Sequence, residues 1–480
     1  ELTGYPYLNI GSEDFQTNSG TGSEYTSNSV FGRVIYSYAD RYLFQANVRH
    51  DGSSRFAKGY RWGTFPSFSA GWVASEEKFM KNLKWDWLSF LKLRGSWGML
   101  GNERIGSNYF PYIALMSFGN SLFYMADGSV VSDKTARPAV LAVEDITWET
   151  TTSTDLGLDV NFLNNRLQFH FDYYWKETKD MLLNIEIPYF MGYNNPSTNA
   201  GKMSTHGYDI EVAWNDQIGD FKYGVNVNFS DFLSKIDYMN DGEQISGGKI
   251  KRAGVLFNEF YGYVCEGIYQ TQEEVNNSAR TSTTVTVGDL KYRDISGPDG
   301  VPDGVISPEY DRVPLGNSLP RFQYGGSLNA SYKGIDFSLA FQGIGKQNSY
   351  LSTSMVQPLR DNYGNVPAIL EGKYWSPFNT TEENLAAKYP RLSNVSKSNN
   401  YATSNFWMFN GSYFRLKNIT LGYTLPKSWT QKAGINRARF YVSGSDLFCL
   451  SNFPSGWDPE MGTSDYPITT SLVMGIQVNF

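Results

Sequence analysis

An acidic, glycine-rich stretch from Gly288 to Val313 is the part of the chain whose side chains could hold a metal ion. Alternating carboxylates and carbonyls around glycines are the ligands that a hard cation such as Ca²⁺ requires. We therefore predict a calcium site at Asp294, Asp299 and Asp303 that stiffens this loop. A solvated acidic turn is the alternative, because the bidentate glutamate that completes such a loop is missing. The oxygen-bearing side chains are Asp289, Asp294, Ser296, Asp299, Asp303 and Asp311.

Aromatic residues near the C-terminus are candidates for binding a sugar. Rings of this kind stack on flat ligands and also fill the cores between loops. Tyr401, Trp407 and Trp457 are the predicted substrate-binding residues, and the alternative is that they pack the loops against one another. Phe406 and Phe409 belong to the same group.

The sequence gives little indication of a transition-metal site, an enzyme active site, nucleic-acid binding or a disulfide framework. The three histidines, His50, His170 and His206, lack the spacing of a transition-metal site. Nothing resembles a phosphate-binding loop or a nucleophile elbow, so we do not expect an enzyme. The net charge of −7 disfavours nucleic acid as a partner. Cys265 and Cys449 are too few and too far apart to form a disulfide framework.

The last eleven residues show the clearest strand pattern. One face is apolar and the other small or polar, as expected when side chains alternate along a strand. About ten residues is the length that a tilted strand needs to cross a bilayer. An apolar last strand ending in phenylalanine also resembles the assembly signal of bacterial outer-membrane barrels. That signal would comprise Leu472, Met474, Ile476, Val478 and Phe480.

The same alternation recurs along the chain, often with charges on the polar face. A soluble sandwich would have to expose that face to solvent, whereas a wide membrane barrel turns it towards a wet lumen and its apolar face towards lipid. No stretch of 18 or more apolar residues exists, which excludes a membrane helix but not a barrel strand. We predict about thirteen strands, at 30–38, 41–50, 64–74, 88–98, 151–162, 166–176, 207–214, 221–230, 321–332, 335–343, 412–425, 437–445 and 470–480.

Short and long connections alternate between these strands, as in outer-membrane barrels with tight inner turns and long outer loops. The expected long loops are 99–150, 177–206, 231–320, 344–411 and 446–469. An odd number of strands cannot close a bacterial barrel. We therefore expect 1–29 to be an extracellular loop segment and 30–480 to be the C-terminal portion of a transmembrane antiparallel β-barrel, with further strands upstream.

Several stretches resemble SusC/RagA-type TonB-dependent transporters of Bacteroidetes outer membranes. The resemblance extends from about Val30 to Phe480. Its main segments are Gly32 to Leu43, Asp51 to Phe56, Phe65 to Trp72, Leu93 to Gly98, Asn199 to Gly201, Asp311 to Asn317, Phe414 to Tyr423 and Asp458 to Glu460.

The resemblance implies a 22-stranded barrel with a plug, of which about nine strands would lie upstream. It implies import of an oligosaccharide or oligopeptide across the outer membrane, energised by TonB through the missing N-terminal part and assisted by a SusD-like lipoprotein. The family often has Asp-x-Asn-x-Asp-Gly in the acidic loop, and here Asp294 to Gly300 is one residue out of step. The alternatives are a passive porin or structural barrel, and a soluble carbohydrate-binding β-protein.

Overall fold

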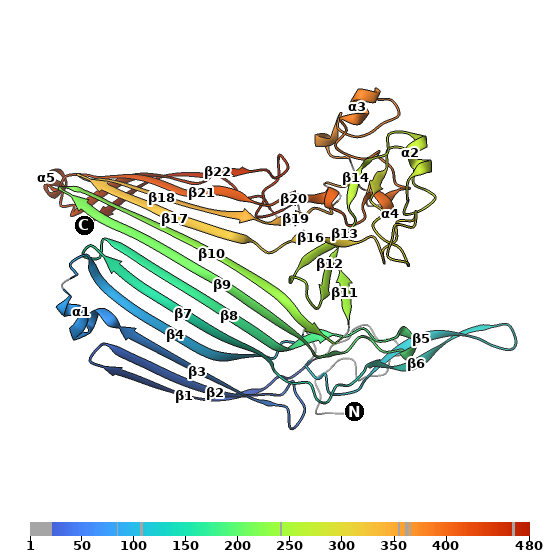
Figure 1. The fold of residues 1–480 in the computed structure, drawn as a ribbon, viewed down its shortest axis with the longest axis horizontal. Coiled ribbons are helices and arrows are strands. Elements are labelled where there is room, and N and C mark those ends of the chain that lie inside the picture. The colour runs from blue at the N-terminus through green and yellow to red at the C-terminus, as the bar shows by residue number, and fades with distance from the viewer. Residues whose placement is uncertain are drawn as a thin grey trace.

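Thirteen antiparallel strands form one sheet in chain order (Figure 1). The structure, a computed structural model, describes residues 22–83, 85–105, 109–240, 242–353, 356–360, 364, 366–462 and 466–480. The edge strands of the sheet are the first and the last. The strands are β1 (Ser27–Tyr38), β2 (Tyr42–Ser53), β3 (Trp62–Val73), β4 (Leu88–Asn102), β7 (Glu149–Phe162), β8 (Leu167–Asn184), β9 (Ser197–Ile218), β10 (Phe221–Met239), β17 (Arg321–Tyr332), β18 (Ile335–Lys346), β21 (Tyr413–Thr424), β22 (Arg437–Ser451) and β23 (Ser471–Asn479).

The strand pairing builds a continuous apolar face. Directly paired residues point to the same side of a sheet. One row crosses five strands through Leu93, Leu158, Phe171, Ile210 and Phe229. A second row continues through Val225, Leu328, Leu339, Ile419, Gly444 and Leu472. The apolar face is therefore shared by neighbouring strands and is suited to contact lipid.

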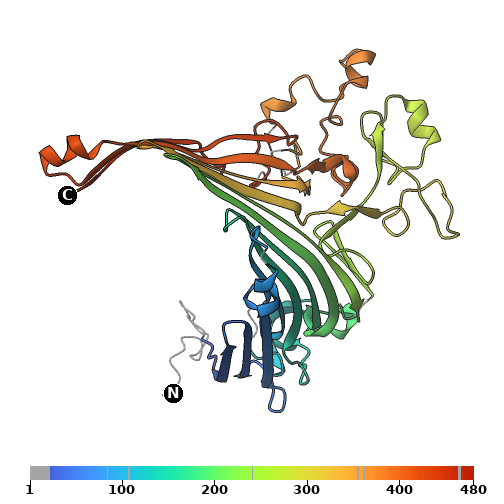
Figure 2. The ribbon, with the colours of Figure 1, turned by 60° about the vertical axis from the view of Figure 1, so that its left-hand side comes forward.

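The opposite face is polar in the same register. Arg94 pairs with Gly157, which pairs with Asp172, and the row continues through Asp209 to Ser230. The sheet is a single curved layer (Figure 2). Such a layer, polar on one side and apolar on the other, is the wall of a water-filled membrane barrel.

The two ends of the wall differ. At the short-turn end, tight reversals are formed by residues with positive φ, such as Lys333 (45°) and Gly334 (90°). Two consecutive residues of this kind match the twist of a β-hairpin. The connections at this end are 39–41, 74–87, 163–166, 219–220, 333–334 and 425–436. Those at the long-loop end are 54–61, 103–148, 185–196, 240–320, 347–412 and 452–470.

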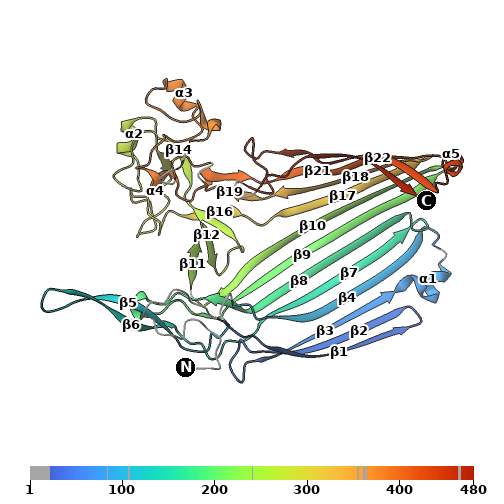
Figure 3. The same cartoon turned by 180° about the vertical axis from the view of Figure 1, so that it is seen from behind.

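The longest connections fold into small structures of their own at the long-loop end (Figure 3). A projecting hairpin consists of β5 (Leu115–Tyr124) and β6 (Val130–Val140). A four-stranded sheet consists of β11 (Glu243–Ser246), β12 (Lys249–Arg252), β13 (Glu259–Gly262) and β16 (Val313–Asn317), in that order. Two further sheets have two strands each: β14 (Cys265–Ile268) pairs with β15 (Leu290–Tyr292), and β19 (Asn348–Tyr350) pairs with β20 (Met408–Asn410).

The helices in the described part of the chain are all short and lie outside the wall. No helix among the described residues has the length and apolar content to span a membrane. At the long-loop end they are η3 (Tyr189–Met191), α2 (Gln272–Asn277), η4 (Ala368–Leu370), α3 (Thr381–Leu385), α4 (Lys397–Asn400) and η5 (Asn405–Trp407). At the short-turn end they are η2 (Ala74–Glu76), α1 (Lys78–Asn82), α5 (Lys427–Thr430) and η6 (Gln431–Ala433).

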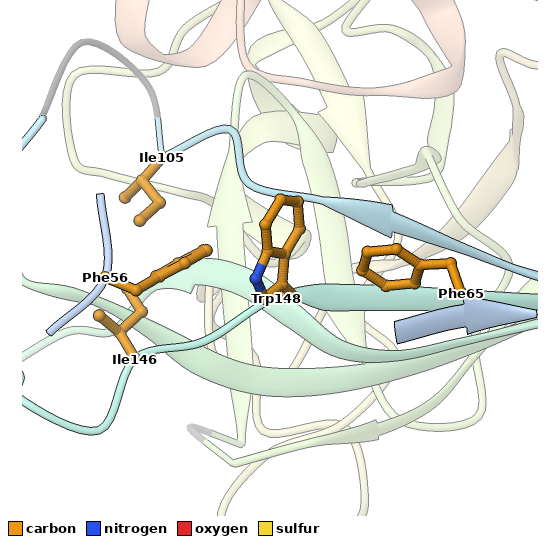
Figure 4. Packing of buried hydrophobic residues seen from close by; sticks show 5 residues of the cluster. All are labelled: Phe56, Phe65, Ile105, Ile146 and Trp148. Atoms are coloured by element: carbon orange, nitrogen blue, oxygen red, sulfur yellow. The ribbon is translucent and has the colours of Figure 1, made fainter. Parts of the chain in front are cut away.

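The buried apolar clusters lie at or beyond the long-loop end, because both faces of the wall meet lipid or water. One cluster packs Phe56, Phe65, Ile105, Ile146 and Trp148 between strand ends and loops (Figure 4). Three further clusters lie within the loops. Their buried members are Tyr263, Leu290, Tyr292 and Ile306, then Leu351, Val356, Trp407 and Phe453, and finally Tyr269, Val275 and Val285.

The prediction of thirteen barrel strands is confirmed, since each expected range overlaps one strand of the large sheet. The lengths differ. β8, β9 and β10 extend past the expected ends at 176, 207 and 230. β1 begins at Ser27, so 27–29 belong to the wall and not to the expected loop segment, while 1–21 lie outside the described residues. The β5–β6 hairpin was not predicted.

Candidate functional site: the polar wall and the folded loops

Arg94 of β4 is the centre of an ion-pair cluster on the polar face. Its guanidinium lies 2.5 Å from Asp172, 3.2 Å from Asp159 and 3.7 Å from Asp155. His170 Nδ1 lies 3.0 Å from the same Asp159. The cluster joins β4, β7 and β8 and sets three carboxylates around one guanidinium. This part of the wall therefore presents mainly negative charge to the lumen.

The polar face of β10, β17 and β18 carries amides and hydroxyls instead. Asn226, Asn228, Ser327 and Gln342 are among the residues that line a hollow of about 540 Å³. Amide groups both donate and accept hydrogen bonds, and hydroxyls do the same. This part of the wall can therefore contact neutral polar groups without requiring a charge.

Arg415 ties the last outer loop to the polar wall. Only 3% of its side chain is exposed. Its guanidinium lies 2.6 Å from Asp458 and 2.5 Å from Glu460, both in the loop 452–470. Gln342 Nε2 of β18 also donates to Glu460, at 3.1 Å. These contacts hold the loop against the mouth of the wall.

Asp289 joins the two largest loops, 240–320 and 347–412. Its carboxylate is fully buried. It accepts hydrogen bonds from Arg391 Nε at 2.7 Å, Ser396 Oγ at 2.9 Å and Asn400 Nδ2 at 3.0 Å. A buried charge persists when it is paired and its remaining lone pairs are hydrogen-bonded. Asp289 therefore fixes how these two loops pack.

The aromatic candidates mainly pack the loops. Trp407 is fully buried, and its Nε1 donates to the Asn400 carbonyl at 2.7 Å. The prediction that Trp407 stacks on a sugar is therefore wrong, because no face of its ring is exposed. The Tyr401 hydroxyl donates to the Pro358 carbonyl, and burial raises the pKa of Tyr401 to about 12. Trp457 is half-buried against the same cluster. Substrate contact by Tyr401 and Trp457 stays a prediction.

Two carboxylates of the acidic stretch have structural roles. Asp289 is occupied by the loop contacts above. Asp311 is fully buried and accepts from the backbone amides of Ile295 and Ser307, both at 2.7 Å. Neither carboxylate is free to bind a cation without losing these hydrogen bonds.

The three predicted calcium ligands do not form a complete site. Asp294 Oδ2 accepts from Gly304 N at 2.7 Å, and Asp303 Oδ1 accepts from Val305 N at 2.9 Å. Asp294 Oδ1 is buried without a hydrogen-bond partner, and Asp299 is exposed. Among the described residues, no three His, Cys, Asp or Glu side chains converge on a metal-sized space. The calcium site therefore stays a prediction.

Calcium binding to this loop can be tested by melting the full-length protein with calcium and with a chelator. If the site exists, saturating calcium raises the melting temperature, since a ligand at about 100 times its Kd stabilises by about 2.7 kcal/mol. The variant Asp294→Asn should lose the effect. Identical melting curves with calcium and chelator would rule the site out.

The C-terminal strand presents its alternate apolar residues on an exposed edge. Leu472 and Met474 are 73% and 81% exposed, and both continue the apolar rows of β22. Ile476, Val478 and Phe480 follow at the short-turn end and are also exposed. This geometry fits a strand that is recognised during assembly, and that role stays a prediction.

Sequence reasoning identified the rows of the wall but not the residues that connect them. Alternation along the expected strand 88–98 predicts only that Arg94 lies on a polar face, and Arg415 enters only as part of the family segment Phe414 to Tyr423. The signal for Arg94 was available, because carboxylates occur at matching positions of two neighbouring strands. No comparable local signal marks Asp289 and Arg391, whose numbers differ by 102.

Comparisons with known proteins give a consistent result. A family model described as TonB dependent receptor-like, beta-barrel, matches residues 2–443. TonB-dependent receptor P3 of Formosa agariphila is 31% identical over 94% of this chain and 45% of its own length. TonB-dependent receptor SusC of Bacteroides thetaiotaomicron is 30% identical over 94% of this chain and 43% of its own length.

A solved structure shows the same fold. The RagAB peptide transporter aligns with a TM-score of 0.73 and 23% identity, over 95% of this chain and 48% of the solved chain. The chain thus spans about half the length of the relatives that it matches.

Proposed function

The chain belongs to the family of TonB-dependent receptor-like β-barrels, and from that premise we propose that it takes part in importing a bulky nutrient across the outer membrane. The outer membrane is the location of this family. The soluble carbohydrate-binding alternative is therefore wrong. The family is one of transporters rather than a class of enzymes.

The observation that carries the proposal is the two-sided wall with folded loops at one end only. The apolar rows meet lipid, and the polar rows line the passage. The Arg94 cluster and the amide-rich hollow give this passage charged and neutral hydrogen-bonding groups. These groups support passage of a large polar molecule such as an oligosaccharide or oligopeptide.

Coupling to TonB belongs, in this proposal, to the part of the protein that this chain does not cover. The matched relatives named as TonB-dependent receptors are about twice as long. A plug that fills the lumen and contacts TonB would account for that additional length. The polar wall described here would then be the surface against which the plug and the substrate move.

A SusD-like surface lipoprotein is the proposed partner at the long-loop end. The loops 240–320 and 347–412 are folded and joined through Asp289, which provides a stable surface. This surface exposes large apolar side chains, with Phe378 at 96%, Val395 at 70% and Leu385 at 67%. Exposed apolar groups on an otherwise polar surface often mark a docking site for another protein.

Uptake of labelled oligosaccharides and oligopeptides tests the proposal. Cells with the intact gene, with the gene deleted, and with TonB deleted are compared. Import requires both the gene and TonB, so uptake of at least one substrate class should fall to background in both deletion strains. A passive porin or structural barrel, the alternative, would give uptake that does not change when TonB is deleted.

A further inference from the structure

The connection between β3 and β4, residues 74–87, is the longest at the short-turn end and carries exposed apolar side chains. Phe79 is 54% exposed, Leu83 48%, Trp85 44% and Trp87 49%. We call these four side chains the interfacial foot. Among the other connections at this end, 219–220 and 333–334 are tight turns, whereas 425–436 carries one exposed tryptophan, Trp429, at 63%.

Glu77 fixes the start of this connection to the apolar side of the wall. Tyr42 pairs with Trp72, and Trp72 pairs with Leu93, which belongs to the first apolar row. All three side chains therefore lie on the apolar face. The Trp72 indole donates to Glu77 Oε1 at 3.2 Å, and the Tyr42 hydroxyl donates to the same oxygen at 2.5 Å. Arg41 Nη1 lies 3.0 Å from the other oxygen. The chain therefore turns towards the lipid-facing side and not into the lumen.

The aromatic rings keep the rest of the connection on the same side. The Phe79 ring centroid lies 6.5 Å from that of Trp72. Trp87 stacks on Phe162 at 5.8 Å, and Trp85 stacks on Trp87 at 5.4 Å. Phe162 is the last residue of β7 and belongs to its apolar face. The foot is thus continuous with the apolar rows at both of its ends.

We propose that the interfacial foot binds the phospholipid leaflet at the short-turn side of the membrane, with its indoles at the level of the headgroups. Tryptophan is enriched where hydrocarbon meets headgroups, because its indole has an apolar body and one N–H donor. Lys78 and Lys81 lie in α1, the short helix that also contains Phe79. Lysine can extend its ammonium group into the headgroup layer. Lys81 is also paired with Glu76 at 2.6 Å, so the foot does not require an anionic lipid.

The test uses the full-length protein in phosphatidylcholine bilayers that carry bromine either just below the headgroups or deep in the acyl chains. Bromine quenches tryptophan fluorescence only near contact. The difference in emission between wild type and the double variant Trp85→Phe, Trp87→Phe isolates the two indoles of the foot. We expect this difference signal to be quenched at least about twofold more by the shallow bromine than by the deep one.

Trp457→Phe is the matched control. Trp457 lies in the outer loop 452–470, so the difference in emission between wild type and this variant should be quenched by neither bromine. For the double variant, a difference signal that neither bromine quenches would overturn the proposal, since the indoles would then face water, the lumen or a periplasmic protein. Equal quenching by both bromines would also overturn it, because the indoles would then lie within the hydrocarbon. No transport is measured, so these outcomes do not depend on the proposed import.

Discussion

Replacing Leu472 with arginine is expected to destabilise the membrane-inserted barrel by on the order of 2–4 kcal/mol, or to prevent its assembly. Leu472 is 73% exposed on the apolar face, and its partner Gly444 is the middle residue of β22. An arginine at this height would have to enter the hydrocarbon without a partner. Folding of the full-length protein into lipid vesicles, followed as a function of urea, measures the cost.

Gln477→Arg is the matched control on the opposite face of the same strand. Gln477 pairs with Arg439, whose guanidinium is already bound by Asp336. A charge introduced there remains in the wet lumen, so the variant should assemble as the wild type does. Equal destabilisation by the two substitutions would show that the assignment of faces is wrong.

The second large effect is expected for Arg391→Ala, which leaves the Asp289 carboxylate buried without its cation. Removing one partner of a buried ion pair costs about 3–5 kcal/mol. Asp289 would keep Ser396 and Asn400 as donors, but these cannot neutralise its charge. The packing between the loops 240–320 and 347–412 should therefore loosen. Limited proteolysis of the full-length protein should cut these loops at a lower protease concentration than in the wild type.

A second variant separates the charge from simple loss of packing. Adding Asp289→Asn to Arg391→Ala removes the uncompensated charge and should restore much of the protease resistance. Asp299→Asn, an exposed change in the same loop, should have no effect. If the double variant is cut as readily as Arg391→Ala, the charge of Asp289 is not what holds the loops.

The wall was accessible to sequence reasoning because its pattern is local. Alternation along a strand depends only on which face meets lipid, so runs such as Leu156 to Phe162 and Phe221 to Phe229 indicate a strand without knowledge of its neighbours. The parts of β8, β9 and β10 at the long-loop end were missed. There the strands stay paired, but beyond the bilayer the sequence no longer alternates between apolar and polar residues.

The folded loops were not accessible in the same way. Their contacts join residues that are far apart in sequence, such as Asp289 with Arg391 and Tyr292 with Asn399. Nothing near Trp407 distinguishes a ring that packs a core from one that contacts a sugar. The family resemblance identified Asp458 to Glu460 as a characteristic segment, but only the structure shows that these carboxylates bind Arg415.

In this wall, neighbouring residues of one strand face water and lipid alternately. The most direct test is to place single cysteines along β10 of the full-length protein at Val225, Asn226, Val227 and Asn228, after replacing Cys265 and Cys449 with serine, and to label the protein in membranes with a water-soluble thiol reagent. Strong labelling is expected at Asn226 and Asn228, which face the lumen, and weak labelling at Val225 and Val227, which face lipid. Uniform labelling along the four positions, or the reverse pattern, would contradict this alternation.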